Sequence, residues 1–209
     1  MVAYGNLNTN LGSISTDILL KFENKLKNLR YNGNIKSNNL QLGKLLNDKK
    51  LGLISFNLNS NGLKKENSAV QGNVKAIFNE IQYNNYTYKD VKFNGKFDGK
   101  GFDGGIVLND ENVNANFKGV IDLTKKLPIY DFDIEVTAMN LNALKLTNKY
   151  QGSLLSFYGT TNMIVNSLDN LNGFVLFDNI KFTNKDKTLN VSEIKFVSRT
   201  DNNESNFQI

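Results

Sequence analysis

Apolar and polar residues alternate along most of the chain. Residues 70–78 and 91–97 carry an apolar or small side chain at every second position, with mostly Asn, Lys, Asp, Gln or Thr between them. The same alternation recurs in residues 113–121, 130–138 and 155–165. A period of two is typical of a β-strand that has one face covered and the other in water. The pattern therefore predicts an all-β protein.

Turn-forming pairs separate these alternating segments. Asn, Asp and Gly tolerate the positive φ angles of tight hairpins, and such pairs at short spacing indicate a meander of about fourteen antiparallel strands. The predicted turns are Asn61-Gly62, Asn84-Asn85, Asp98-Gly99, Asn109-Asp110, Lys125-Lys126, Asp169-Asn170 and Asn184-Lys185.

Helical patterns are scarce. The two candidates are Leu40–Leu46 and Leu141–Leu146, each about two turns long and each preceded by an asparagine, Asn39 or Asn140. Asparagine is a favourable N-cap residue. We therefore expect one or two short helices.

The two helical candidates belong to an internal repeat. Asn39-Leu40 and Asn140-Leu141 are 101 positions apart, and the segments beginning at Leu53 and Leu154 keep this spacing. Later matches lie 99 to 103 positions apart, as expected for loops that differ by a residue or two. We expect residues 1–209 to form one elongated β unit made of two similar halves, with approximate repeats at 30–99 and 130–200.

The strand number limits the architecture. Fourteen strands are more than a twisted open sheet usually holds, which leaves a closed barrel, a sandwich or a long curved trough. The abundance of Phe on the apolar parity predicts an apolar covered face. Glycines on this parity indicate either ordinary sheet curvature, which the residues alone favour, or the inner bend of a groove. They are Gly72, Gly95, Gly119, Gly159 and Gly173.

The composition removes many classes of chemistry. The chain has no Cys and no His, so disulfides, thiolate metal sites and histidine acid–base catalysis are excluded. The formal charge of +5 comes from 25 basic and 20 acidic residues. Lysines at predicted turns lie beside acidic residues and form no nucleic-acid footprint. These lysines are Lys44, Lys49, Lys50, Lys64, Lys65, Lys125 and Lys126.

Three groups of residues have a possible site chemistry, and in each group a structural role is favoured. Acidic and amide residues at turns resemble a calcium loop without its spacing: Asp98, Asp103, Asn109, Asp110 and Asn112. Asp131, Asp133 and Glu135 could supply paired carboxylates for glycoside hydrolysis, but they oppose the apolar parity. Tyr83, Tyr86 and Tyr88 could stack on sugars or bases, and tyrosine also favours strands. We predict no catalytic residue, no metal and no cofactor.

The strand patterns resemble those of the AsmA-like/TamB family of envelope proteins. The resemblance lies in Tyr86-x-Tyr88-x-x-Val91-x-x-x-Gly95-x-Phe97 with its following Phe102-Asp103-Gly104, and in Tyr31-x-Gly33-x-Ile35 leading to Asn39-Leu40. It covers most of residues 29–200 without an invariant motif. It implies an elongated antiparallel sheet curved into an open trough (β-taco-like), in a periplasmic protein anchored in the inner membrane and reaching toward the outer membrane.

The resemblance also implies a function. Such proteins are associated with phospholipid transport to the outer membrane and with assembly of outer-membrane proteins, so the expected partners are phospholipid or another acyl-chain ligand and, for a parent chain, an outer-membrane assembly protein. The chain begins and ends within apparent strands, and we expect a fragment of a longer, membrane-anchored protein. No nucleic acid is expected.

The groove lining follows from parity. The predicted residues are Val74, Ala76, Phe78, Val91, Phe93, Phe97, Val113, Phe117, Phe132, Ile134, Leu155, Phe157, Val175 and Phe177. The alternative interpretation is a β-sandwich or β-solenoid adhesin or scaffold module, which would bury the same parity in a closed core.

Overall fold

The computed structural model describes residues 1–25, 27–167, 170–185, 187–201 and 204–208. These residues form two compact units. Unit 1 comprises Met1–Gly99 with Leu108–Asp110, and unit 2 comprises Lys100–Val107 with Glu111–Ile209. The predicted all-β antiparallel fold with little helix is confirmed, with thirteen strands in the described residues against the fourteen expected.

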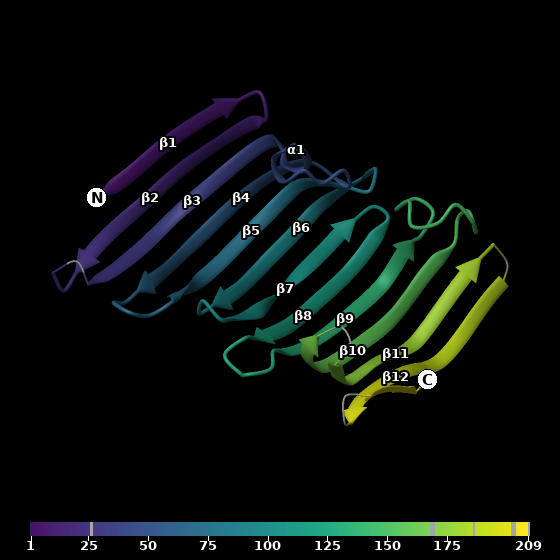
Figure 1. Ribbon diagram of the computed structural model, residues 1–209. Coiled ribbons are helices and arrows are strands. Elements are labelled where there is room, and N and C mark those ends of the chain that lie inside the picture. The colour runs from purple at the N-terminus through teal and green to yellow at the C-terminus, as the bar shows by residue number, and fades with distance from the viewer. Residues whose placement is uncertain (26, 168–169, 186, 202–203, 209) are drawn as a thin grey trace. The chain divides into compact units, whose positions relative to one another are not determined.

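The strands of unit 1 follow one another in space as they do in sequence (Figure 1). Each pairs antiparallel with its neighbour in the chain. They are β1 (Val2–Thr9), β2 (Gly12–Glu23), β3 (Asn28–Gln41), β4 (Leu51–Lys64), β5 (Val70–Tyr83) and β6 (Tyr86–Phe97), with α1 (Leu42–Leu46) between β3 and β4.

Unit 2 repeats this meander. Its strands are β8 (Val113–Asp122), β9 (Ile129–Asn140), β10 (Leu154–Ser167), β11 (Asn170–Asn184), β12 (Lys187–Asp201) and β13 (Glu204–Gln208), each antiparallel to the next. The residues of β7 (Gly101–Asp110) are divided between the units. Short connections explain the topology, because a tight turn can only join antiparallel neighbours.

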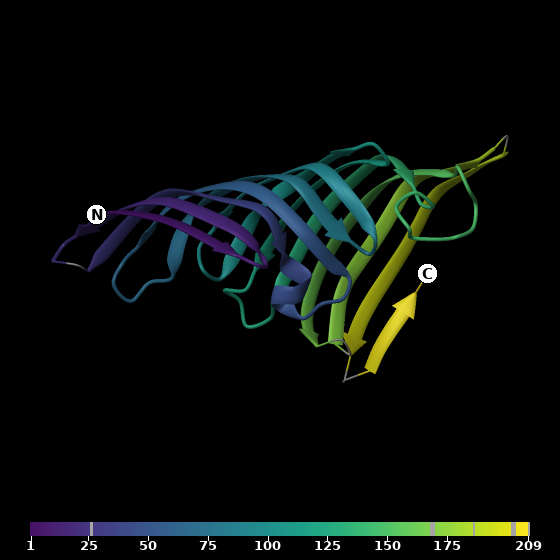
Figure 2. The same ribbon diagram turned by 90° about the horizontal axis from the view of Figure 1, so that it is seen from above.

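Each unit has a line of irregular pairing that crosses several strands. In unit 1 the register shifts between Ser37 and Leu40 and between Ser55 and Phe56, and Asn39 has a φ of 52°. In unit 2 it shifts beside Ala115 and on both sides of Phe157. Bulges bend a strand and increase its twist. The strands of unit 1 are accordingly bent along their length in Figure 2.

The helical predictions are half right. α1 begins after Gln41, and its cap has no side-chain hydrogen bond; Asn39 lies in the left-handed region within β3 instead of capping the helix. Residues 141–146 form hydrogen-bonded turns and no helix, so this prediction is wrong. Asn140 still caps the segment, because its Oδ1 accepts a hydrogen bond from the Ala143 amide at 3.0 Å. A single turn bonded in this way is too short to propagate.

Most predicted turns are found between strands, with four corrections. Asn109-Asp110 lies at the end of β7, and the turn that follows is formed by residues 111–112. Lys64 lies at the end of β4. Asn61-Gly62 lies inside β4 and not at a turn, because Gly62 pairs with Gly72 of β5. Lys44 lies in α1. Asn84 and Asn85, with φ of 49° and 62°, form the β5–β6 hairpin that their sequence predicts. The Asp169-Asn170 turn lies partly outside the described residues.

Some side-chain contacts within unit 1 have a counterpart within unit 2, at the spacing of the sequence repeat. Phe56 and Phe78 have ring centroids 5.9 Å apart, and Phe157 and Phe177 have theirs 5.5 Å apart. The hydroxyl of Ser60 donates to the Asn73 carbonyl at 2.9 Å, and 101 residues later the hydroxyl of Thr161 donates to the Phe174 carbonyl at 2.8 Å. We therefore retain two similar halves as an interpretation of the sequence.

Candidate functional site

The predicted lining residues of unit 1 all lie on one face of its sheet. The register places Ala76 of β5 opposite Phe93 of β6, and Phe78 opposite Val91. Ala76 and Val91 are buried, whereas the two phenylalanines are half-buried. Val74 and Phe97 lie on the same face, opposite Gly95 and Gly72, and are also half-buried.

This apolar face extends over strands that the predicted lining does not include. The row through Ala76 and Phe93 continues to Leu58, Ile35 and Thr16, and the row through Phe78 continues to Phe56 and Ile14. The alternation of isoleucines in residues 14–18 could have identified β2. The bulge at Asn39 conceals the parity of β3.

Unit 2 brings its eight predicted residues together on one face. Paired neighbours form two rows, one through Phe117, Ile134 and Phe177, and one through Phe132 and Val175. Val113 and Leu155 lie in a third row, both opposite Met139. Val113 is buried; the others, Phe117, Phe132, Ile134, Leu155, Phe157, Val175 and Phe177, are half-buried. Buried Ala115 and Val136 belong to this face but were not predicted.

Among the described residues, no strand or helix forms a second layer on the apolar face of its own unit. The segment before β10 does pack locally against unit 2: Leu144 is 2% exposed, and the Tyr150 ring contacts Phe182. Within the described residues, the extensive contacts of each strand in a unit are with its neighbours along the sheet, and α1 packs on β4. A sandwich would need a second layer on this face. The large rings therefore remain half-buried, while the small residues between them are buried.

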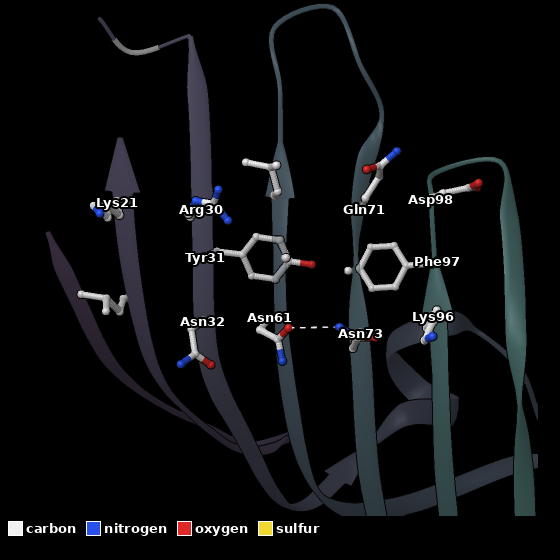
Figure 3. A pocket seen from close by; sticks show the side chains of 14 residues that line it. Lys21, Arg30, Tyr31, Asn32, Asn61, Gln71, Asn73, Lys96, Phe97 and Asp98 are labelled. Carbon is white, nitrogen blue, oxygen red and sulfur yellow. Dashed lines mark hydrogen bonds between the residues drawn. The ribbon is translucent and has the colours of Figure 1, made fainter. Parts of the chain in front are cut away.

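Glycines on the apolar face make room for side chains of the neighbouring strand. A Cβ on Gly119 would lie 1.9 Å from the Phe132 ring, and a Cβ on Gly159 would lie 2.7 Å from Ile134. In unit 1 the Tyr31 ring reaches from β3 over Gly62, with its hydroxyl at Gly72, and Phe97 reaches from β6 (Figure 3). These close approaches explain Gly72, Gly119 and Gly159 on the predicted apolar parity.

The opposite face of unit 1 carries amides and basic groups. Asn61 accepts a hydrogen bond from the Asn73 amide at 3.2 Å, and Asn57 accepts one from Asn34 at 2.7 Å. A pocket of about 590 Å³ is lined by Lys21, Arg30 and Asn61 of this face and also by Tyr31 and Phe97. Arg30 donates through Nε to both carboxylate oxygens of Glu23 at 3.1 Å.

The opposite face of unit 2 carries the three carboxylates considered for glycoside hydrolysis. Each accepts a hydrogen bond from β10: Glu135 from Tyr158 at 3.1 Å, Asp133 from Thr160 at 3.1 Å and Asp131 from Asn162 at 2.8 Å. They point away from the apolar parity, as predicted, because the register alternates faces. Phe174, half-buried on this same face below the Lys195 ammonium, was not predicted there.

Ionisable groups respond to these local partners. The hydrogen bond to Glu135 raises the pKa of Tyr158. The Glu135 carboxylate accepts a hydrogen bond from the neutral phenol, and its negative charge disfavours the phenolate. The Arg30 hydrogen bond lowers the pKa of Glu23. Burial raises the pKa of Tyr88, and the nearby Asp110 charge adds to the shift. Thr124 lowers the pKa of Asp122 through its hydroxyl and its amide.

Three of the remaining candidate residues, Asp110, Tyr86 and Tyr88, have structural partners. Asp110 accepts hydrogen bonds from the Tyr86 hydroxyl and, at 2.8 Å, from the Lys89 amide, and it lies in no cluster of metal-binding residues within the described ranges. Tyr86 and Tyr88 pack edge to face with centroids 4.8 Å apart. These contacts use the tyrosines within the sheet and give no stacking platform.

The comparisons with known proteins add no assignment. No family model, no curated protein and no solved structure matches this chain. Among the described residues, no helix combines the length and the apolar character that crossing a bilayer requires.

Proposed function

We propose that this chain is a non-enzymatic binding segment whose apolar sheet faces hold lipid acyl chains. The observation that supports this proposal is the set of half-buried Phe, Ile, Leu and Val side chains on one face of each unit, on which no described strand or helix of that unit forms a second layer. Each methylene moved from water onto such a surface contributes up to about 0.8 kcal/mol. An acyl chain can therefore bind without a directional contact.

The biological setting is part of the same proposal. The strand patterns resemble the AsmA-like/TamB family, whose members act in the periplasm from an inner-membrane anchor. We extend this setting to the chain: phospholipid transport toward the outer membrane, or assembly of proteins there. Head groups would remain in water at the edge of the apolar face, so selectivity for one lipid tail is not expected.

The test uses two phenylalanines on opposite faces of unit 2. Phe132, on the apolar face, has its ring centroid 5.0 Å from that of Phe117. Phe174 is also half-buried but lies on the polar face. We expect Phe132→Asn to weaken binding of a fluorescent fatty acid severalfold, and Phe174→Asn to leave it nearly unchanged.

The measurement is a titration of the purified chain with the fluorescent acyl probe. Circular dichroism of both variants checks that the β-structure is retained. Equal weakening of binding by both substitutions contradicts the proposal, and so does an absence of binding by the unsubstituted chain. Absence of binding together with strong resistance to denaturant would favour the adhesin or scaffold alternative.

A further inference from the structure

A cavity lies at one end of the apolar face of unit 2. It has a volume of about 730 Å³ and is formed where the β11–β12 hairpin meets the segment before β10. Volumes of roughly 300–1,000 Å³ are typical of small-molecule sites. The cavity therefore has the size of a ligand site.

The inner part of the cavity is apolar. Phe182 of β11 pairs with Leu189 of β12, and the Tyr150 ring packs edge to face on Phe182 at a centroid distance of 5.6 Å. Leu189 is 60% exposed and Tyr150 57% exposed, so both offer apolar surface to a ligand. Phe182 also pairs with Leu155, which joins the cavity to the predicted lining residues.

Positive charge borders this apolar surface. Lys185 and Lys187 line the cavity, both are exposed, and neither forms an ion pair with a described residue. The hairpin sequence Lys185-Asp186-Lys187 has a net positive charge. An apolar wall beside two lysines is complementary to an amphiphile with a negatively charged end.

The equivalent region of unit 1 is built differently. Its hairpin carries Asn84 and Asn85 instead of lysines, and the Asn84 amide donates to the Lys50 carbonyl at 2.8 Å. The segment before β4 is thus bonded directly to the hairpin. In unit 2 the segment before β10 instead contacts Phe182 through the Tyr150 ring.

We infer that this cavity binds the charged end of an anionic single-chain amphiphile, with the anion at Lys185 and Lys187 and the hydrocarbon on Phe182, Tyr150 and Leu189, directed toward Leu155. This inference rests on the proposed acyl-chain function. It adds to that function a preferred ligand charge and a fixed end of the binding surface.

The binding test compares two detergents below their micelle concentrations. Dodecyl phosphate and dodecyl maltoside share a hydrocarbon chain and differ in head-group charge. We expect dodecyl phosphate to bind about 5-fold more tightly at low salt, a modest preference because exposed charge pairs are weak and screened. The double variant Lys185→Gln, Lys187→Gln should abolish this preference and leave dodecyl maltoside binding unchanged.

A matched double variant controls for net charge. Lys118 and Lys181 are exposed, and Lys118 lies on the polar face, opposite Asp133. Lys118→Gln with Lys181→Gln removes the same charge and should preserve the preference. If this control loses the preference equally, the effect comes from overall charge and the inference is wrong.

A fluorescence experiment tests the location. The chain has no tryptophan, so Tyr150→Trp introduces a single reporter at the cavity and Tyr158→Trp introduces one on the polar face. Brominated dodecyl phosphate should quench the first variant strongly and the second weakly. Equal quenching would contradict the assigned position.

The two failures can be told apart. If neither detergent binds, the acyl-chain function itself fails. If both bind equally and the lysine variant changes nothing, the function stands and the anionic site is wrong.

Discussion

Strands β3 and β9 align in the repeat that the sequence predicts, yet their polar faces carry opposite charge. Arg30, Asn32 and Asn34 of β3 correspond, 101 residues later, to Asp131, Asp133 and Glu135 of β9. On the other face, apolar residues are retained: Ile35 of β3 corresponds to Val136 of β9. Packing restricts the apolar face, whereas hydration tolerates either charge on the polar face.

The difference extends over the two units. Unit 1 has fourteen basic and eight acidic residues, and unit 2 has eleven basic and twelve acidic residues. The formal charge of +5 therefore arises within unit 1. The total charge of the chain hides this asymmetry, because it does not show in which unit the excess of basic residues lies.

The largest expected effect comes from placing a charge on the apolar face. Val136 is 1% exposed, so Val136→Asp should destabilise the chain by more than about 3 kcal/mol, because a buried carboxylate would have no partner. Thr137→Asp, at the exposed neighbouring position, removes the hydrogen bond from the Thr137 hydroxyl to the Asn114 carbonyl and should cost only about 1 kcal/mol. Urea denaturation measures both; similar losses would contradict the separation of the faces.

Glycine substitutions should be the next largest effect, and they should be stronger in unit 2. A Cβ at Gly72 would lie 2.4 Å from the Asn61 carbonyl oxygen and 2.5 Å from the Tyr31 hydroxyl. Its equivalent, Gly173, combines a 2.0 Å approach to the Asn162 oxygen with a φ of 143°. We expect Gly72→Ala to cost about 1–3 kcal/mol and Gly173→Ala more, because it adds backbone strain. Equal midpoints for the two variants in denaturant would contradict this order.

Removing one of the three side-chain hydrogen bonds between β10 and the carboxylates of β9 should have a smaller effect. Thr160→Val deletes the donor to Asp133 and should cost about 0.5–1 kcal/mol. A double-mutant cycle with Asp133→Asn isolates the pair. A coupling energy of zero would show that the hydrogen bond between Thr160 and Asp133 contributes no stability.

The smallest effects are pH-dependent and oppose one another in the two units. The lowered pKa of Glu23 means that its contribution is present above the ordinary carboxyl pKa and is lost as the pH falls through the folded value. The raised pKa of Tyr158 means that its contribution is present below the ordinary tyrosine pKa and is lost as the pH rises. Glu135→Gln should lower the Tyr158 pKa, measured by tyrosinate absorbance against Tyr158→Phe; an unchanged titration would contradict the assigned cause.

The features that follow from local periodicity were predictable from sequence. Alternation predicts the strands and, within each unit, the shared face of the predicted lining residues, and Asn84-Asn85 predicts its hairpin. Asn61-Gly62 misleads because the same dipeptide that favours a turn also fits inside a strand when a neighbouring ring, here Tyr31, covers the glycine. That ring comes from another strand, so no local pattern contains the information.

The cavity of unit 2 was not predictable for a similar reason. It depends on the Tyr150 ring reaching Phe182, 32 positions later in the chain, and on the lysines that flank the hairpin between β11 and β12. In the sequence Tyr150 lies in a polar segment with no strand or helix period. Only the register of β10 with β11, which sets Leu155 against Phe182, joins this segment to the apolar face.

In each unit, every described strand pairs only with strands that are next to it in the chain, and this has a consequence for how the unit folds. Most hairpins close a short loop, so little chain entropy is lost before the first cross-strand contacts form, and contact order stays low for an all-β protein. Assembly can begin at any hairpin and spread strand by strand, as in other repetitive folds. We therefore expect rapid refolding and gradual, segment-wise loss of amide protection in hydrogen exchange, in place of one all-or-none opening.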